Sequence, residues 1–198
     1  MKIRVALAIV IGFVTLPVFA SAVLQVGFDE LVRSSEFIFE GRVVSERAET
    51  DTKGVIRTYV TFEVMDVFKG VYSERTLALP YLGGTVGNQT MEVSDLHRPG
   101  VGERGIYFVE SLARPPAHPL YGWDQGHFIV RQERTDQMER VFTRSGKPVA
   151  GFQTVTNKPA GLSTGVAAGL LLSNAGETTQ GLTVLQFKQK VRELLNTR

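Results

Sequence analysis

Alternation of apolar and polar positions is the strongest pattern in the chain, and it spans residues 36–70. Mostly apolar or small residues stand at every second position over 37–43 and again over 56–64. A period of two places alternate side chains on opposite faces of a strand, so one set is expected to be buried. Residues 51–54, Asp-Thr-Lys-Gly, have the composition of a tight turn. The pattern predicts a long β-hairpin.

Further short apolar runs predict more strands, at residues 76–82, 91–94, 106–110 and 127–132, and a last hairpin over 140–152 that turns at Ser145 and Gly146. Pro80 lies inside one run and favours an edge strand or a bulge there. Strands that follow one another with few helices between them are typical of antiparallel sandwiches and small barrels. We therefore expect a mainly β protein, a small antiparallel OB-like barrel of five to six strands.

Helical spacing occurs in two segments, residues 28–35 and 182–196. The first predicts a short N-terminal helix with Phe28 and Leu31 on its apolar face. The second predicts an amphipathic C-terminal helix, and Thr183 and Gln186 have the spacing of a capping box. We expect this helix to pack on the barrel, and docking to a partner is the alternative.

Residues 1–22 have the features of an export signal. Lys2 and Arg4 precede an apolar core, and Ala20-Ser21-Ala22 has the small-x-small pattern that signal peptidases recognise. The apolar run is shorter than the roughly 20 residues of a membrane-spanning helix. We expect cleavage after Ala22 and a periplasmic or extracellular protein, with an uncleaved anchor as the alternative.

The rest of the chain divides into three parts: a β-barrel domain (23–152), a linker rich in Gly, Ala, Thr and Ser (153–181) and the C-terminal helix (182–198). Within the linker, residues 166–172 could form a brief helix.

Charge and cysteine content exclude several classes of protein. The chain has 22 Lys and Arg against 20 Asp and Glu, and Lys2 and Arg4 lie in the leader, so the rest carries 20 of each sign. A neutral chain lacks the positive field that nucleic-acid binding requires, and we expect no nucleic-acid partner. The chain contains no cysteine, which excludes disulfides, thiol nucleophiles and cysteine-ligated zinc.

Catalytic-looking motifs occur twice, and both lack the required context. Residues 100–105 match G-x-G-x-x-G but follow Pro99 and precede a strand, whereas a dinucleotide site needs a strand before the glycines and a helix after them. Residues 161–165 match the nucleophile elbow G-x-S-x-G, yet no histidine follows Ser163. We interpret the first motif as a turn and expect no serine hydrolase.

Histidine is the remaining source of metal-binding or acid–base chemistry. His97, His118 and His127 match no compact ligand spacing, and we interpret them as surface or rim residues. Acidic residues are scattered rather than paired. We therefore expect no catalytic residues, no metal and no cofactor. A metal-dependent enzyme that uses the three histidines is the less favoured alternative.

Two loops carry the candidate binding residues. Loops on rigid β-scaffolds commonly bind ligands, and Trp and Tyr are favoured anchors of interfaces. The alternative is that Trp123 packs beneath its own loop as part of the core. The candidate residues are Tyr81, Gly83, Gly84, Tyr121, Trp123, Asp124 and Gln125.

Four stretches together resemble a family of uncharacterised exported bacterial proteins: residues 31–41 (LVRSSEFIFEG), 58–70 (TYVTFEVMDVFKG), 98–110 (RPGVGERGIYFVE) and 122–130 (GWDQGHFIV). The leading part is also similar to the netrin-like domain of tissue inhibitors of metalloproteinases, which implies an OB-like barrel. Those inhibitors place an N-terminal cysteine on the zinc of the protease, and this chain has none. No functional residue is therefore carried across.

These observations favour an exported, non-enzymatic module that binds a protein or an extracellular ligand through its loops. An exported protease or a surface component is the expected kind of partner. The alternative is an inhibitor or accessory module of a co-exported metalloprotease. The oligomeric state is left open.

Overall fold

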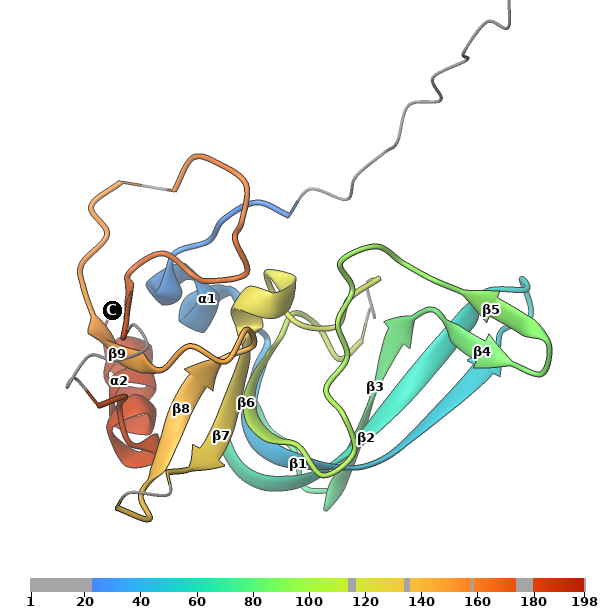
Figure 1. Ribbon diagram of the computed structural model, residues 1–198, viewed down its shortest axis with the longest axis horizontal. Helices are drawn as coiled ribbons and strands as arrows, with labels where there is room; N and C mark the ends of the chain where they lie inside the picture. Colours follow the sequence, from blue (N-terminus) through green and yellow to red (C-terminus); the bar gives the residue numbers. More distant parts are fainter. Residues whose placement is uncertain (1–22, 114–116, 134–135, 158, 174–179, 198) are drawn as a thin grey trace, which may run out of the picture.

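A computed structural model describes residues 23–113, 117–133, 136–157, 159–173 and 180–197, and the predicted leader lies outside them. These residues form two α-helices and one 3-10 helix in addition to the strands, and Figure 1 shows their arrangement. The helices are α1 (Phe28–Ser34), η1 (Trp123–Gly126) and α2 (Val184–Asn196). The strands are β1 (Phe37–Thr50), β2 (Ile56–Lys69), β3 (Thr76–Leu82), β4 (Gly84–Val86), β5 (Gln89–Met91), β6 (Arg104–Val109), β7 (His127–Gln132), β8 (Glu139–Thr143), β9 (Val149–Phe152) and β10 (Leu170–Leu172).

The main sheet has six antiparallel strands in the order β3-β2-β1-β6-β7-β8, which confirms a mainly β fold. The described strands do not close into the expected barrel, because β3 and β8 remain its two edges. The chain that leads into α2 covers the free edge of β8, where the Val141 N–H donates to the Leu182 carbonyl at 3.0 Å. Pro80 lies in edge strand β3, as predicted.

The predicted hairpin is confirmed as β1 and β2, which pair from Ile38 and Lys69 to Thr50 and Ile56. Asp51 closes its turn, because its Oδ1 accepts hydrogen bonds from the N–H groups of Lys53 at 2.8 Å and Val55 at 2.9 Å. These bonds favour the ionised carboxylate and lower the pKa of Asp51.

Hydrophobic residues fill both faces of the sheet centre. One face packs against α1 and α2, where the ring of Phe28 contacts those of Phe108, Phe128 and Phe187. The other face forms a second core that includes Phe39, Phe62, Tyr81 and Tyr107. The start of β1 is therefore buried on both faces, whereas the alternation predicted burial of one set of its side chains.

Helix α2 confirms the predicted amphipathic C-terminal helix and its capping box. Lys188 on α2 pairs with the buried Glu40 of β1, and Glu40 also accepts from Arg104 Nε at 2.6 Å. This ion pair, together with the apolar face of the helix, holds α2 on the sheet. No helix among the described residues is long and apolar enough to cross a membrane.

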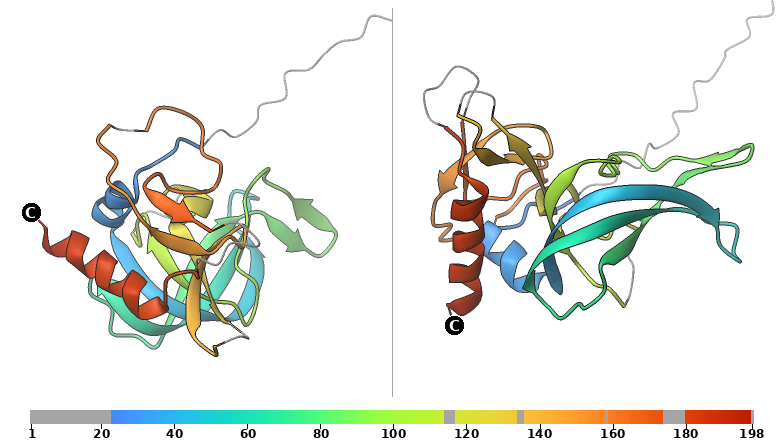
Figure 2. Two further views of the ribbon diagram at one scale, coloured as in Figure 1. Left: turned by 60° about the vertical axis from the view of Figure 1, so that its left-hand side comes forward. Right: turned by 90° about the horizontal axis from the view of Figure 1, so that it is seen from below.

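The small sheets correct three local expectations. The Gly-rich segment 83–90 forms most of the β4–β5 hairpin, and the strand expected over 91–94 ends at Met91. The hairpin expected over 140–152 does turn at Ser145 and Gly146, where the Thr143 N–H donates to the Lys147 carbonyl at 2.8 Å, but β9 pairs with β10 and not with β8. Residues 170–172 form strand β10 and not a brief helix. Figure 2 shows α2 and the β4–β5 hairpin on opposite sides of the molecule.

Candidate functional site

The two loops predicted to bind a ligand meet through three aromatic rings. The ring of Tyr81, near the end of β3, lies 5.1 Å from that of His118 at an interplanar angle of 78°. His118 in turn stacks on Trp123, with centroids 5.2 Å apart and an angle of 16°. The Leu82 N–H donates to the carbonyl of Ala117 at 3.0 Å and ties β3 to the connection between β6 and β7. Tyr81 and Trp123 are thus joined through His118, which the sequence pattern predicted to be a surface or rim residue.

His118 is held in its neutral form. Its Nδ1 accepts from the N–H of Leu120 at 3.2 Å, and its Nε2 donates to the carbonyl of His97 at 3.3 Å. Burial disfavours the charged ring and lowers the pKa of His118 to about 3. The ring is therefore a rigid apolar support for Trp123 rather than an acid or base near neutral pH.

Trp123 has an unusual backbone conformation. Its φ is +60°, after Gly122 with a φ of +66°, and a bulky residue in the left-handed region is a genuine outlier. Gln125 fixes this turn to the N-terminal segment: its Oε1 accepts from the Val26 N–H at 2.9 Å and its Nε2 donates to the Leu24 carbonyl at 2.9 Å. Gln125 is buried, so its role here is to position Trp123 and residues 24–26.

A small pocket opens beside Trp123, with a volume of about 120 Å³. Asp124 contributes its side chain to this pocket, and its Oδ2 accepts from His97 Nδ1 at 2.8 Å. Asp95 also lines the pocket, and its φ of +59° lies in the left-handed region. We call this the Trp123 pocket, and its lining residues are Val23, Asp95, Gly122, Trp123, Asp124, Ser163 and Gly165.

The G-x-S-x-G motif takes part in this pocket as a turn. Ser163 Oγ accepts from the N–H of Gly165 at 2.9 Å, and no strand or helix adjoins the motif as a nucleophile elbow requires. Residues 161–163 also run beside the N-terminal segment, since the Ser163 N–H donates to the Val23 carbonyl at 2.8 Å. The other glycine motif is a turn before β6, as predicted, with the Glu103 N–H on the Gly100 carbonyl at 3.0 Å.

Two exposed leucines adjoin the pocket. Leu24 and Leu162 face each other in an isolated antiparallel bridge, and they are 69% and 64% exposed. Each is a chain neighbour of a residue that lines the Trp123 pocket. We call these two residues the leucine pair. In Figure 1 the segments that carry them cross above α1 and η1, and the bridge shows that they are in contact there.

Five of the seven expected binding residues lie outside the pocket: Tyr81 and Gln125 are buried supports of Trp123, and the other three lie elsewhere. Gly83 and Gly84 allow close approach: a Cβ on Gly83 would lie 2.7 Å from the Met91 carbonyl oxygen, and one on Gly84 would lie 2.3 Å from Thr58 Oγ1. Tyr121 is half-buried on the core that faces the helices, and its hydroxyl lies 3.4 Å from Glu30 Oε1. Among the predicted residues, the pocket itself contains Trp123 and Asp124.

The interpretation of the histidines as surface or rim residues is wrong for two of them. His118 and His127 are each only 1% exposed, because the β6–β7 connection and the second core enclose them. His127 Nε2 donates to Glu103 Oε1 at 2.6 Å, and the hydroxyl of Tyr107 lies 3.4 Å from the same oxygen. In the part of the chain that the structure describes, no group of three or more His, Asp or Glu side chains is arranged to hold a metal.

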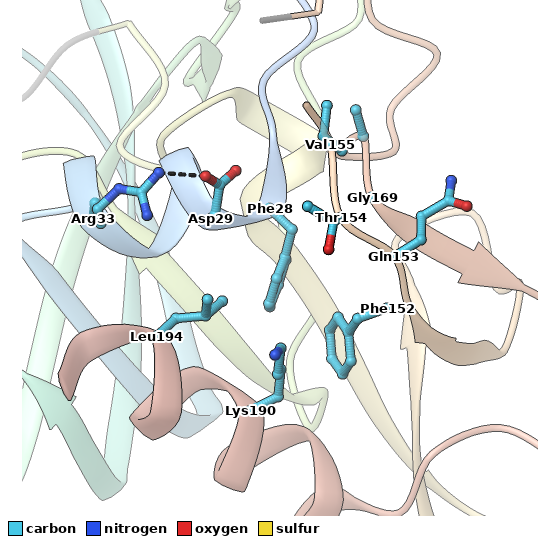
Figure 3. A pocket seen from close by; sticks show the side chains of 11 residues that line it. Phe28, Asp29, Arg33, Phe152, Gln153, Thr154, Val155, Gly169, Lys190 and Leu194 are labelled. Carbon is cyan, nitrogen blue, oxygen red and sulfur yellow. Dashed lines mark hydrogen bonds and ion pairs between the residues drawn. The ribbon is translucent and has the colours of Figure 1, made fainter. Parts of the chain in front are cut away.

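A second pocket, of about 240 Å³, lies between α1, α2 and the strap formed by residues 152–155. Figure 3 shows the rings of Phe28 and Phe152 on its floor and the charged ends of Asp29, Arg33 and Lys190 around it. Arg33 pairs with Asp29, and Lys190 donates to Glu193 at 2.7 Å. Its charged groups are thus already paired with neighbours on the same helices.

Sequence reasoning missed Asp95, His97, His118 and Ser163 as parts of the site. His97, His118 and Ser163 stand out in the sequence only separately, as histidine or motif residues, but their proximity arises from pairing between segments far apart in the chain, which no local pattern indicates. The fold and site define a mainly β protein with a pocket held between its loops. No family model, curated protein or solved structure matches this chain, and the resemblance to exported and netrin-like proteins stays a prediction.

Proposed function

We propose that this protein is an exported, non-enzymatic module that binds a protein partner at the Trp123 pocket and the leucine pair. The observation that carries the proposal is the pairing of two largely exposed leucines, at 69% and 64%, beside a pocket lined by the chain's single tryptophan. Apolar side chains around a rigid aromatic residue are the usual composition of a protein interface centre.

Rigidity supports binding as the role of this surface. His118 supports the indole of Trp123 from behind, and Gln125 fixes the backbone on both sides. A surface that is ordered before it meets its partner loses less conformational entropy on binding. The export signal predicted over residues 1–22 directs such a module outside the cytoplasm, where a co-exported protease or a surface component is the expected partner.

A capture experiment tests this function. The chain beginning at Val23 is immobilised and incubated with the exported fraction of cells that produce it, beside a variant carrying Leu24→Ser and Leu162→Ser. A control carries Val71→Ser and Leu185→Ser. These two side chains are also exposed, Val71 at 96% and Leu185 at 62%.

We expect a partner that the wild type and the control retain and that the leucine-pair variant loses, because two exposed contacts at the centre of the interface are removed. Retention of the same proteins by all three would contradict the proposed surface. Turnover of substrate by the purified protein in a broad hydrolase screen would contradict the non-enzymatic assignment.

A further inference from the structure

The Trp123 pocket contains the residue that processing would make the first of the chain. Ala20-Ser21-Ala22 predicts cleavage directly before Val23, and Val23 lines the pocket. Hydrolysis of the Ala22–Val23 peptide bond by a signal peptidase consumes one water and leaves a carboxylate on Ala22 and an amine on Val23. An α-amine has an ordinary pKa of about 7.7–8.0, so the new N-terminus is mostly an ammonium at neutral pH.

Backbone pairing fixes Val23 at this place. Its carbonyl accepts from the N–H of Ser163 at 2.8 Å, and the N–H of Gln25 donates to Gly161 at 3.0 Å. The Leu24 carbonyl accepts in addition from Gln125 Nε2 at 2.9 Å. The first described residues are therefore held as a short strand-like segment along residues 161–163.

The lining of the pocket also includes two aspartates, Asp95 and Asp124. Asp124 uses Oδ2 to accept from His97, while its Oδ1 is buried and has no hydrogen-bond partner among the described residues. Asp95 lines the same small volume of about 120 Å³ and is exposed to solvent. A buried carboxylate oxygen without a donor is costly, so a cation or another hydrogen-bond donor close to Asp124 would stabilise it.

We infer that the α-ammonium of Val23, formed by cleavage after Ala22, is the cation of the Trp123 pocket and pairs with Asp124 and Asp95. In the uncleaved chain the same nitrogen belongs to a neutral peptide bond. Cleavage therefore supplies the positive charge that the pocket lacks in the uncleaved chain. This inference rests on the processing proposed above.

The ion pair has a consequence for partner binding. It anchors residue 23, and hence Leu24 beside Leu162, in the position where the leucine pair is exposed. The ion pair adds to the backbone hydrogen bonds that already hold this segment, so we expect the leucine pair to be held more firmly after cleavage than before it.

The test compares two purified proteins, one that begins at Val23 and one that carries an additional Met before it. A fusion partner removed by an added protease gives both ends, so the result is independent of export and of any partner. Both proteins are prepared as wild type, with Asp95→Asn and Asp124→Asn together, and with Asp29→Asn as a control outside the pocket. Asn suits position 95 because it tolerates the left-handed backbone found there.

Urea unfolding at pH 7 gives the folding equilibrium constant of each protein. We expect it to be about tenfold larger for the chain that begins at Val23, in the wild type and in the Asp29→Asn control, since a charged hydrogen bond is formed. In the double Asn variant the difference falls to about twofold or less. An equal difference in the double variant would show a purely steric effect and overturn the inference, as would no difference in the wild type.

Titration of the ¹⁵N-labelled amine by NMR gives a second readout that needs no extended chain. The groups that face this amine are Asp95 and Asp124, with His97 behind them. We expect its pKa to rise by about one unit from its ordinary value, which is a tenfold effect. The associated stability is present at pH 7 and is lost as the pH rises through the raised pKa. An unshifted pKa would overturn the inference.

Discussion

Protonation of His118 should destabilise the protein as the pH falls below 7. The ring is 1% exposed, lies between Tyr81 and Trp123, and uses both nitrogens in its neutral form. A second proton would place a donor against the Leu120 N–H and a charge in the core. The folded state therefore resists protonation that the unfolded chain accepts.

The magnitude follows from the two pKa values of this histidine. Burial lowers the pKa of His118 from 6.5 in the unfolded chain to about 3 in the folded protein. Between these values the unfolded chain binds the extra proton, so the free energy of unfolding decreases as the pH falls. From pH 7 to pH 5 this residue removes about 2 kcal/mol, at 1.36 kcal/mol per unit.

Urea unfolding at pH 7 and pH 5, followed by the fluorescence of Trp123, measures this loss. His118→Phe keeps an aromatic ring in the stack and removes the titration, and Gln132→Met serves as the control because Gln132 is exposed on β7 and does not titrate. We expect the loss between the two pH values to be about 2 kcal/mol smaller in His118→Phe than in wild type and in the control. Equal losses in all three proteins would refute the reasoning about the buried neutral ring.

Two further predictions concern the frame that supports the site. A Cβ on Gly105 would lie 2.5 Å from the Phe128 carbonyl oxygen, so Gly105→Ala should lower the free energy of unfolding, measured in urea, by about 3 kcal/mol. Gly100 has open space around it, so the control Gly100→Ala should change that free energy by less than about 0.5 kcal/mol. Gln125→Met is nearly isosteric but leaves the backbone of residues 24–26 without its partners, and should cost about 1–3 kcal/mol, whereas the exposed Gln132→Met is close to neutral. Equal effects within either pair would contradict the corresponding contact.

Local patterns were sufficient for much of the fold. The alternation that ends at Gly70 predicted the β1–β2 hairpin, Pro80 predicted an edge strand, and Thr183 with Gln186 predicted the start of α2. Each of these depends on residues a few positions apart. Strand β10 was missed because residues 170–172 are a short apolar run that periodicity alone does not separate from a helix.

Long-range pairing decided the rest. Whether the sheet closes into a barrel depends on which segment reaches the free edge of β8. That segment contains Leu182, whose carbonyl accepts from the Val141 N–H, and neither the strand pattern around Val141 nor the helical pattern around Leu182 indicates this contact. The site shows the same limit. Trp123 and Asp124 were predicted from composition, but Asp95 and Ser163 join them only because separate loops meet.

The central claim is that the protein binds its partner at the Trp123 pocket and the leucine pair. The most direct measurement is photo-crosslinking in the producing cells, with benzoylphenylalanine at position 162 or, as a control, at position 71, where Val71 is 96% exposed. The account predicts that position 162 forms one covalent adduct of defined mass with another exported protein and that position 71 does not. No adduct at position 162, or the same adduct from both positions, would contradict the claim.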